Sequence, residues 1–244
     1  MTRESSATTA APNFDNLLNL RDLGGHPTTD GAVTRSRSLL RSDDLSQLTP
    51  DGLRALKAFG VTTVIDLRWP EEAARHPSPV PAALPQVHFQ RISLLLHSEE
   101  EWDLRSREVS KEGWKTYVLE SLGPELARVL RAIAAAPPAP LLFHCVAGKD
   151  RTGLTAAILL ALADVRAEAI AADYAVSAQN LRAGYLKRYH NTEPERILEI
   201  LRCPEEGSHR MLAFLKQAGG VQAYLEGIGL SRAEVQALRA RLRD

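Results

Sequence analysis

The chain has 244 residues, of which 44% are hydrophobic and 25% are charged, a composition that is ordinary for a soluble globular protein. Its 30 basic and 30 acidic residues cancel, so no overall field exists that would attract nucleic acid or an anionic membrane. An anion-binding site would therefore have to be local. The two cysteines, Cys145 and Cys203, are too few for a disulfide framework and suit a reducing compartment.

The first 13 residues are small and polar, which predicts a disordered leader followed by one domain over residues 14–244. No stretch has the apolar length of a signal peptide core or of a membrane-spanning helix. We therefore expect a cytoplasmic protein without an integral membrane segment, while secretion by a signal-less route stays open. The sequence contains no indication of the oligomeric state.

The N-terminal half predicts strands that alternate with a helix. Thr49 and Pro50 are typical of a helix start, and Gly60 is typical of its end. Runs of apolar and β-branched residues predict strands before and after this helix. The predicted strands cover residues 38–42, 61–68 and 87–94, with a Pro-rich loop at 76–85.

The second half predicts mainly helices around one further strand. Residues 99–136 have a helical pattern interrupted near Gly123 and Pro124, and the apolar run at 140–144 is expected to be a central strand. From Gly153 onward the pattern is helical. Breaks are expected at Gly184, at Cys203 and Pro204, and at Gly219 and Gly220. Strands that alternate with helices indicate an α/β fold with a central, mostly parallel sheet flanked by helices.

The stretch "HCVAGKDRTG" joins this central strand to the following helix and concentrates reactive side chains in one turn. Unpaired N–H groups at such a turn, together with the helix dipole, form an anion site and favour the thiolate form of a cysteine such as Cys145. Arg151 carries a planar fork that can hold two phosphoryl oxygens. Asp150 is the nearest acid for protonating a leaving oxygen. The pattern indicates attack on phosphorus with a phosphocysteine intermediate.

The other positions of this loop fit the same chemistry. Gly148 lets the chain curl without a Cβ clash. The alternative, a buried structural cysteine beside a surface turn, is disfavoured because so many positions of the loop suit a phosphate. The residues expected to surround the phosphate are Val146, Ala147, Gly148, Lys149, Thr152 and Gly153. No metal or other cofactor is expected.

The loop resembles the signature His-Cys-x5-Arg-Ser/Thr of the cysteine-dependent phosphatases. More narrowly, it is similar to a bacterial family of tyrosine phosphatases with lipid-phosphatase character, whose other marks also occur here in order. These marks are "NLRDLGG" (19–25), "LLRSDDL" (39–45), "VIDLRWPEE" (64–72), "ADYAVS" (172–177) and "YLEGIGLS" (224–231). The resemblance covers nearly the whole chain and implies a protein tyrosine phosphatase-like fold with a helical C-terminal half.

The resemblance also implies a role for each loop position. Cys145 would be the nucleophile and Arg151 the phosphate clamp, while Thr152 would hydrogen-bond the sulfur and His144 would orient the loop. A lysine at the place of Lys149 is similar to phosphoinositide 3-phosphatases. An aspartate just before the arginine is similar to myotubularins and to the bacterial family. In that family the loop aspartate, here Asp150, is the favoured general acid, assisted by the aspartate of the "DLR" strand, here Asp66.

Asp66 ends a predicted buried strand, and ligand sites of open α/β sheets form at the carboxyl ends of strands. Asp66 could orient Arg151, act as an acid, or cap the next turn, and these readings stay open. Arg68 and Glu72 are expected to form a supporting ion pair. The "WPE" that follows is rejected as a mobile acid loop, because it comes directly after the strand.

Two segments could cover the loop or simply pack on the body of the protein. Residues 97–120 carry Trp102, Trp114 and Tyr117 among many charges, and packing is the favoured reading. Residues 182–203 mix tyrosines with cationic side chains that would suit phospholipid head groups or phosphopeptides.

The resulting hypothesis is a phosphatase that hydrolyses phosphotyrosine, with phosphoserine, phosphothreonine and phosphoinositides as further substrates. Its partners would be phosphorylated proteins or phosphoinositides, and not nucleic acid. Lys149 suggests the alternative of an enzyme that acts primarily on phosphoinositides. A non-catalytic module that only binds phosphorylated partners is disfavoured, because nucleophile, clamp and candidate acid are all present.

Overall fold

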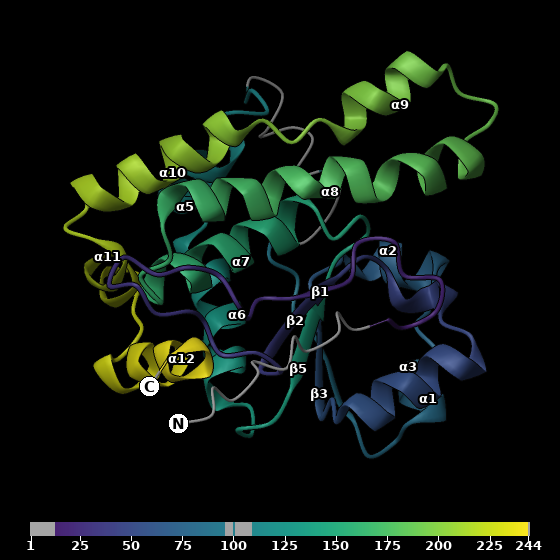
Figure 1. The fold of residues 1–244 in the computed structure, drawn as a ribbon, viewed down its shortest axis with the longest axis horizontal. Helices are drawn as coiled ribbons and strands as arrows, with labels where there is room; N and C mark the ends of the chain where they lie inside the picture. Colours follow the sequence, from purple (N-terminus) through teal and green to yellow (C-terminus); the bar gives the residue numbers. More distant parts are fainter. Residues whose placement is uncertain (1–12, 96–99, 101–108, 244) are drawn as a thin grey trace, which may run out of the picture.

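A mostly parallel sheet lies at the centre of the protein, whose computed structural model describes residues 13–95, 100 and 109–243 (Figure 1). In the described chain five strands follow the order β1-β2-β5-β3-β4, and β1 alone is antiparallel to its neighbour. The strands are β1 (Arg21–Asp22), β2 (Leu39–Ser42), β3 (Thr63–Asp66), β4 (His88–Arg91) and β5 (Leu141–His144). The predicted α/β class and the central place of β5 are confirmed.

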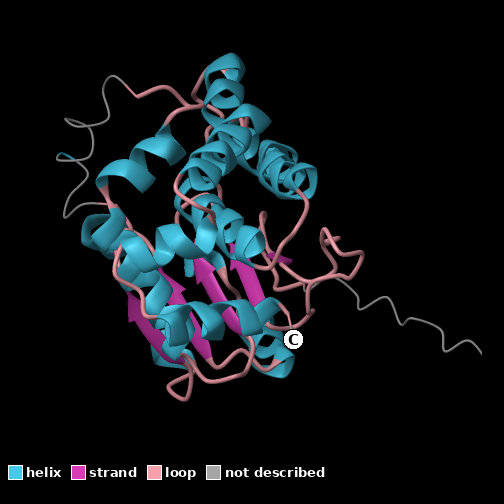
Figure 2. Cartoon of the chain, turned by 90° about the vertical axis from the view of Figure 1, so that its left-hand side faces the viewer, coloured by secondary structure: helices cyan, strands magenta, loops and turns pink. Residues whose placement is uncertain are grey.

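Helices cover both faces of this sheet (Figure 2). They are α1 (Pro50–Phe59), α2 (Pro70–Arg75), α3 (Val80–Ala83), α5 (Trp114–Ser121), α6 (Gly123–Ala135), α7 (Asp150–Leu162), α8 (Ala167–Arg188), α9 (Pro194–Leu201), α10 (Glu205–Gln217), α11 (Val221–Gly227) and α12 (Arg232–Leu242). Leu40 and Leu142 pack with α1 and α3. Their neighbours Leu39 and Phe143 point to the opposite face and pack with α6, α7 and α12.

The predicted boundaries of α1 are confirmed by its caps. The Thr49 hydroxyl accepts a hydrogen bond from the Gly52 N–H, Pro50 occupies the first helical position, and Gly60 ends the helix with φ of +90°. All three devices are local, which explains why they could be read from the sequence.

Other predicted boundaries differ from the structure. No break occurs at Gly184, where α8 continues and a Cβ would come within 2.3 Å of the Leu18 side chain. This glycine is required by close packing and not by a turn. A break occurs instead at Asp164, which has φ of +56° between α7 and α8. The expected breaks at Cys203–Pro204 and Gly219–Gly220 are confirmed.

Helices α8, α9 and α10 run across one end of the sheet (Figure 1). Among the described residues, every helix is too short or too polar to cross a lipid bilayer. The predicted leader, residues 1–13, lies outside the described residues except for its last member.

Candidate active site

The loop of residues 145–149 joins β5 to α7 at the carboxyl end of the central strand, where open α/β sheets place their ligands. Cys145 follows directly on β5 and is only 2% exposed. Gly148 has φ of +62°, and a Cβ there would lie 2.3 Å from the Ser42 carbonyl oxygen. Because only glycine fits this turn against β2, the predicted role of Gly148 in curling the loop is confirmed.

The carbonyl groups of the loop point outward to fixed hydrogen-bond donors. The Val146 oxygen accepts from the backbone N–H of Asp44 at 2.9 Å. The side-chain amide of Asn19 donates to the carbonyls of Ala147 at 2.9 Å and Gly148 at 3.1 Å. In a trans peptide the N–H points away from the carbonyl, so the N–H groups of these peptide planes face the inside of the loop. They donate to no protein group in the described part of the chain, which leaves them available to an anion, and they are called the anion cradle here.

A buried framework of ion pairs and hydrogen bonds supports the loop at the Gly148 carbonyl. Arg41 of β2 donates to the Gly148 carbonyl at 2.8 Å and pairs with Asp173 of α8. Asp173 also binds Arg21 at 2.6 Å, and Arg21 in turn donates to the Asn19 side-chain oxygen. Although burial opposes it, the two arginines lower the pKa of Asp173 to about 2. The framework joins three segments on which the family resemblance rests, residues 19–25, 39–45 and 172–177.

Arg151 lies in the first turn of α7 and is held by the start of α2. Its two terminal nitrogens donate to the two carboxylate oxygens of Glu72 at 2.6 and 2.7 Å. The guanidinium carbon lies 4.6 Å from the centre of the Trp69 ring. Burial alone would lower the pKa of Arg151, but Glu72 and the nearby Cys145 hold it above its ordinary value. The fork is therefore fixed in both charge and orientation beside the loop.

Replacing Glu72 with glutamine should lower kcat/KM about 10- to 100-fold, because the charge-assisted fork that aligns Arg151 is lost. Steady-state kinetics on an aryl phosphate measures this effect. The matched control is Glu71→Gln, since Glu71 lies in the same helical turn but is exposed. Equal activity of the two variants would contradict an aligning role for Glu72.

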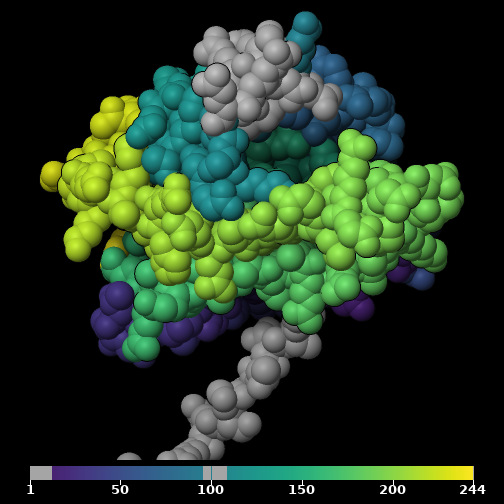
Figure 3. Space-filling view, turned by 90° about the horizontal axis from the view of Figure 1, so that it is seen from above, coloured from purple at the N-terminus to yellow at the C-terminus, as the bar shows by residue number. Residues whose placement is uncertain are grey.

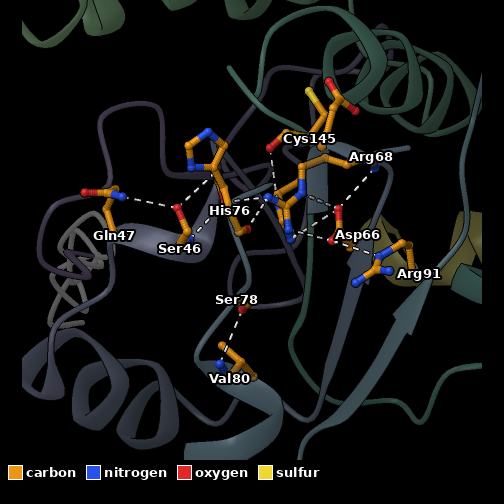
Figure 4. A network of polar contacts seen from close by, with 12 residues as sticks. Ser46, Gln47, Asp66, Arg68, His76, Ser78, Val80, Arg91 and Cys145 are labelled. Carbon is orange, nitrogen blue, oxygen red and sulfur yellow. Dashed lines mark hydrogen bonds and ion pairs between the residues drawn. The ribbon is translucent and has the colours of Figure 1, made fainter. Parts of the chain in front are cut away.

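Asp66 lies at the end of β3, but it does not orient Arg151. Both of its oxygens accept hydrogen bonds from Arg68 at 2.8 Å, and Arg91 lies 3.6 Å away (Figure 4). Asp66 is fully buried. Burial raises its pKa, yet the Arg68 hydrogen bonds leave the pKa of Asp66 below its ordinary value. Glu72, and not Asp66, orients Arg151, because both oxygens of Asp66 are already bound by Arg68.

The predicted ion pair between Arg68 and Glu72 is wrong. The fork of Arg68 is occupied by Asp66, by Asp44 at 2.9 Å and by the His76 carbonyl at 2.9 Å. Glu72 faces Arg151 instead. Arg68 is fully buried and ties the end of β3 to the segments before and after it, which is a supporting position.

Asp150 begins α7 and is the most accessible titratable group of the loop, with 46% of its side chain exposed. Its Oδ1 accepts a hydrogen bond from the Tyr174 hydroxyl at 3.1 Å. Its Oδ2 lies 3.5 Å from the Lys149 amine. That amine donates to the carbonyls of Ile200 at 2.7 Å and Arg202 at 3.3 Å. Lys149 thus contacts the end of α9 as well as the acid beside it.

The flanking loop positions are only partly arranged as expected. The Nδ1 of His144 lies 3.1 Å from the Cys145 carbonyl, while its Nε2 has no hydrogen-bond partner among the described residues. Burial lowers the pKa of His144, which favours the neutral ring. The Thr152 hydroxyl is buried and also has no partner in the described chain. Its expected hydrogen bond to the Cys145 sulfur is therefore not formed in the described structure.

A cavity of about 380 Å³, called the loop cavity here, opens beside the anion cradle. Asp150 is the one carboxylate among the described residues that line it. The cationic side chains of the cavity outnumber this carboxylate, and such an excess of positive charge attracts anions. The aromatic lining is Trp69, Trp114 and Tyr174. The cationic lining is Lys111, Lys149, Arg151 and Arg202.

Residues of both segments that could cover the loop, 97–120 and 182–203, lie beside it. Trp114 of the first segment lines the loop cavity, whereas residues 101–108, with Trp102, lie outside the described residues. Tyr185 and Ile200 of the second segment line another cavity of about 390 Å³, along the outer side of the loop. Figure 3 shows the surface hollowed beside the green wall that α8 and α9 form.

Comparison with known proteins identifies the family of the chain. A model of a tyrosine phosphatase family matches residues 12–244. A tyrosine-protein phosphatase of Nostoc commune is 35% identical over 236 residues, which cover 88% of this chain and 78% of the relative. The triple specificity protein phosphatase PtpB of Mycobacterium tuberculosis is 28% identical over 268 residues, covering 91% of this chain and 95% of the relative. The chain belongs to the tyrosine phosphatase family and is a phosphatase of the hydrolase class.

Proposed function

We propose that the enzyme hydrolyses phosphotyrosine through a phosphocysteine intermediate formed on Cys145. The observation that carries the proposal is the cradle of inward N–H groups around Cys145, closed by an Arg151 fork that Glu72 aligns. These groups supply a nucleophile and fixed donors for the equatorial phosphoryl oxygens, and they are the parts that phosphoryl transfer needs.

In the first step the Cys145 thiolate attacks phosphorus. The S–P bond forms while the bond from phosphorus to the leaving oxygen breaks. Asp150 donates its proton to that oxygen, so the phenol leaves neutral and Asp150 becomes a carboxylate. The position of Asp150 on the wall of the loop cavity supports this role. Lys149 and Arg151 compensate the negative charge of the phosphate.

In the second step water attacks the phosphocysteine. Asp150 now accepts a proton from that water, the S–P bond breaks, and inorganic phosphate and the Cys145 thiolate are released. The Thr152 hydroxyl has no partner among the described residues and would have to turn toward the departing sulfur to stabilise it. Because a thiolate and a protonated acid must coexist in the first step, the rate should pass through an acidic maximum.

The lining of the loop cavity favours an aromatic phosphoester. Three aromatic side chains face a space of about 380 Å³, within the usual range for small-ligand sites. Aromatic rings stack with a phenyl group and contribute beyond simple burial. The name of the mycobacterial relative, a triple specificity phosphatase, supports activity on further classes of phosphoester. We include phosphoserine, phosphothreonine and phosphoinositides among these.

A primarily phosphoinositide-directed enzyme is the second candidate. The apolar cavity on the outer side of the loop favours it, since Tyr185, Ile197 and Leu201 could contact an acyl chain. The environment of Lys149 speaks against a head-group role for this residue. Its amine is already bound by the carbonyls at the end of α9, and the residue is only 5% exposed.

The deciding experiment compares initial rates on a phosphotyrosine peptide, a phosphoserine peptide and a phosphoinositide, for the wild type and Lys149→Met. We expect the phosphotyrosine peptide to be fastest, and Lys149→Met to slow all three substrates by similar factors. Lipid turnover that equals or exceeds peptide turnover and falls selectively in Lys149→Met would favour the second candidate. Phosphopeptide binding without any hydrolysis would indicate a binding module instead.

A further inference from the structure

Lys115 of α5 is a buried lysine that the proposed reaction does not use. It is fully buried, and its amine donates to the Ser208 hydroxyl at 2.8 Å. The same nitrogen lies 3.2 Å from the centre of the Tyr174 ring. Lys115 forms no ion pair with any described carboxylate. A buried amine without a carboxylate partner is costly, so its place over an aromatic face calls for a physical reason.

Tyr174 connects this amine to the wall of the loop cavity. The residue is 2% exposed, and its hydroxyl donates to Asp150 Oδ1 at 3.1 Å. The ring is fixed against α7, since a Cβ on Gly153 would come within 2.9 Å of its Cδ2 atom. Burial raises the pKa of Tyr174, so the phenol keeps its proton and acts as a donor. Lys115, Tyr174 and Asp150 thus form one continuous line of contacts.

We propose that Lys115 and Tyr174 are positioning residues that hold the Asp150 carboxyl ready for proton transfer. The ammonium group over the ring draws electron density from the phenol and strengthens the hydrogen bond that its O–H donates. That bond stabilises the carboxylate that forms as Asp150 gives up its proton. It also occupies Oδ1 and leaves Oδ2 to carry the proton. The inference rests on the proposed role of Asp150 as general acid.

The charge of Lys115 depends on pH in the range where the enzyme would work. Burial lowers the pKa of Lys115 from 10.5 to about 7, so the support is strongest below pH 7 and fades above it. The charged and titratable groups that face Lys115 are Tyr174, Asp173, Arg41, Asp150 and Cys203. The groups that face Asp150 are Lys149, Arg151, Lys115, Tyr174 and Cys203.

The test uses Lys115→Met, Tyr174→Phe and the double variant. Two substrates are compared, a phosphotyrosine peptide and an aryl phosphate whose leaving group needs no proton. Each single variant should lower kcat on the peptide about five- to tenfold and leave the activated substrate within about twofold, since Tyr174→Phe removes the hydrogen bond and Lys115→Met removes the charge that strengthens it. The alkaline limb of the pH–rate profile should move to higher pH. The double variant should be no slower than Tyr174→Phe alone.

Thermal melts check that the variants fold. Lys115→Met should raise the melting temperature most below pH 7, where wild-type Lys115 is charged at a cost, and the gain should shrink toward pH 10. Equal loss on both substrates, additive losses in the double variant, or an unmoved alkaline limb would overturn the inference. If Asp150 is not the general acid, a separate result will show it: Asp150→Asn will slow the peptide and the activated aryl phosphate by the same factor.

Discussion

Replacing Cys145 with serine is expected to reduce turnover by at least about 10⁴-fold, the scale on which loss of a covalent nucleophile acts in hydrolases. A serine hydroxyl at this position is not ionised near neutral pH and lacks the nucleophilicity of a thiolate. Phosphate binding should persist, because the N–H cradle and the Arg151 fork do not depend on the sulfur. Phosphotyrosine peptide hydrolysis and calorimetric binding of the same peptide measure the two effects.

The matched control is Cys203→Ser. Cys203 is half-buried and its thiol donates to the Leu201 carbonyl, while burial raises its pKa. This thiol is therefore a poor nucleophile, and its replacement should leave turnover within about twofold. Full activity of Cys145→Ser would sink the phosphocysteine mechanism. Loss of peptide binding together with turnover would instead indicate that the thiolate helps to shape the cradle.

The parts of the fold that sequence predicts well depend on local chemistry. Thr49, Pro50 and Gly60 bound α1 through contacts within a few residues, so their meaning did not depend on the rest of the molecule. Gly184 carried the same kind of signal but lies inside α8, since its reason is the packing of Leu18 from a distant segment. A glycine that makes room for a side chain cannot be distinguished from a helix end without the tertiary contact.

In the candidate site, too, the contiguous loop is predictable from the sequence and the contacts from distant segments are not. The loop from Cys145 to Arg151 is contiguous, and its spacing alone indicated a phosphate site. Its supports come from elsewhere: Glu72 aligns Arg151 across 79 positions, and Asn19 reaches the loop across 128. Arg68 and Glu72 lie four residues apart in one segment, yet they do not pair with each other. No sequence pattern reveals which of two nearby acids an arginine will choose.

Replacing Asp150 with asparagine should lower turnover of a phosphotyrosine peptide by about 10²- to 10⁴-fold, the usual contribution of a general acid. Asparagine keeps the shape and can still accept from Tyr174, but it has no proton to give to the leaving oxygen. An aryl phosphate with a stable leaving anion should lose much less. The alkaline limb of the pH–rate profile should flatten, because that limb reports loss of the acid's proton.

The matched variant is Asp66→Asn, which tests the other aspartate considered as an acid. Asp66 is fully buried against Arg68, so removing its charge should destabilise the fold by roughly 3–5 kcal/mol. Turnover per folded molecule should remain, with the same dependence on the leaving group as in the wild type. If Asp66→Asn slows the phosphotyrosine peptide much more than the activated aryl phosphate, and Asp150→Asn does not, the acid is Asp66. The framework of Arg68 would then have to open during catalysis.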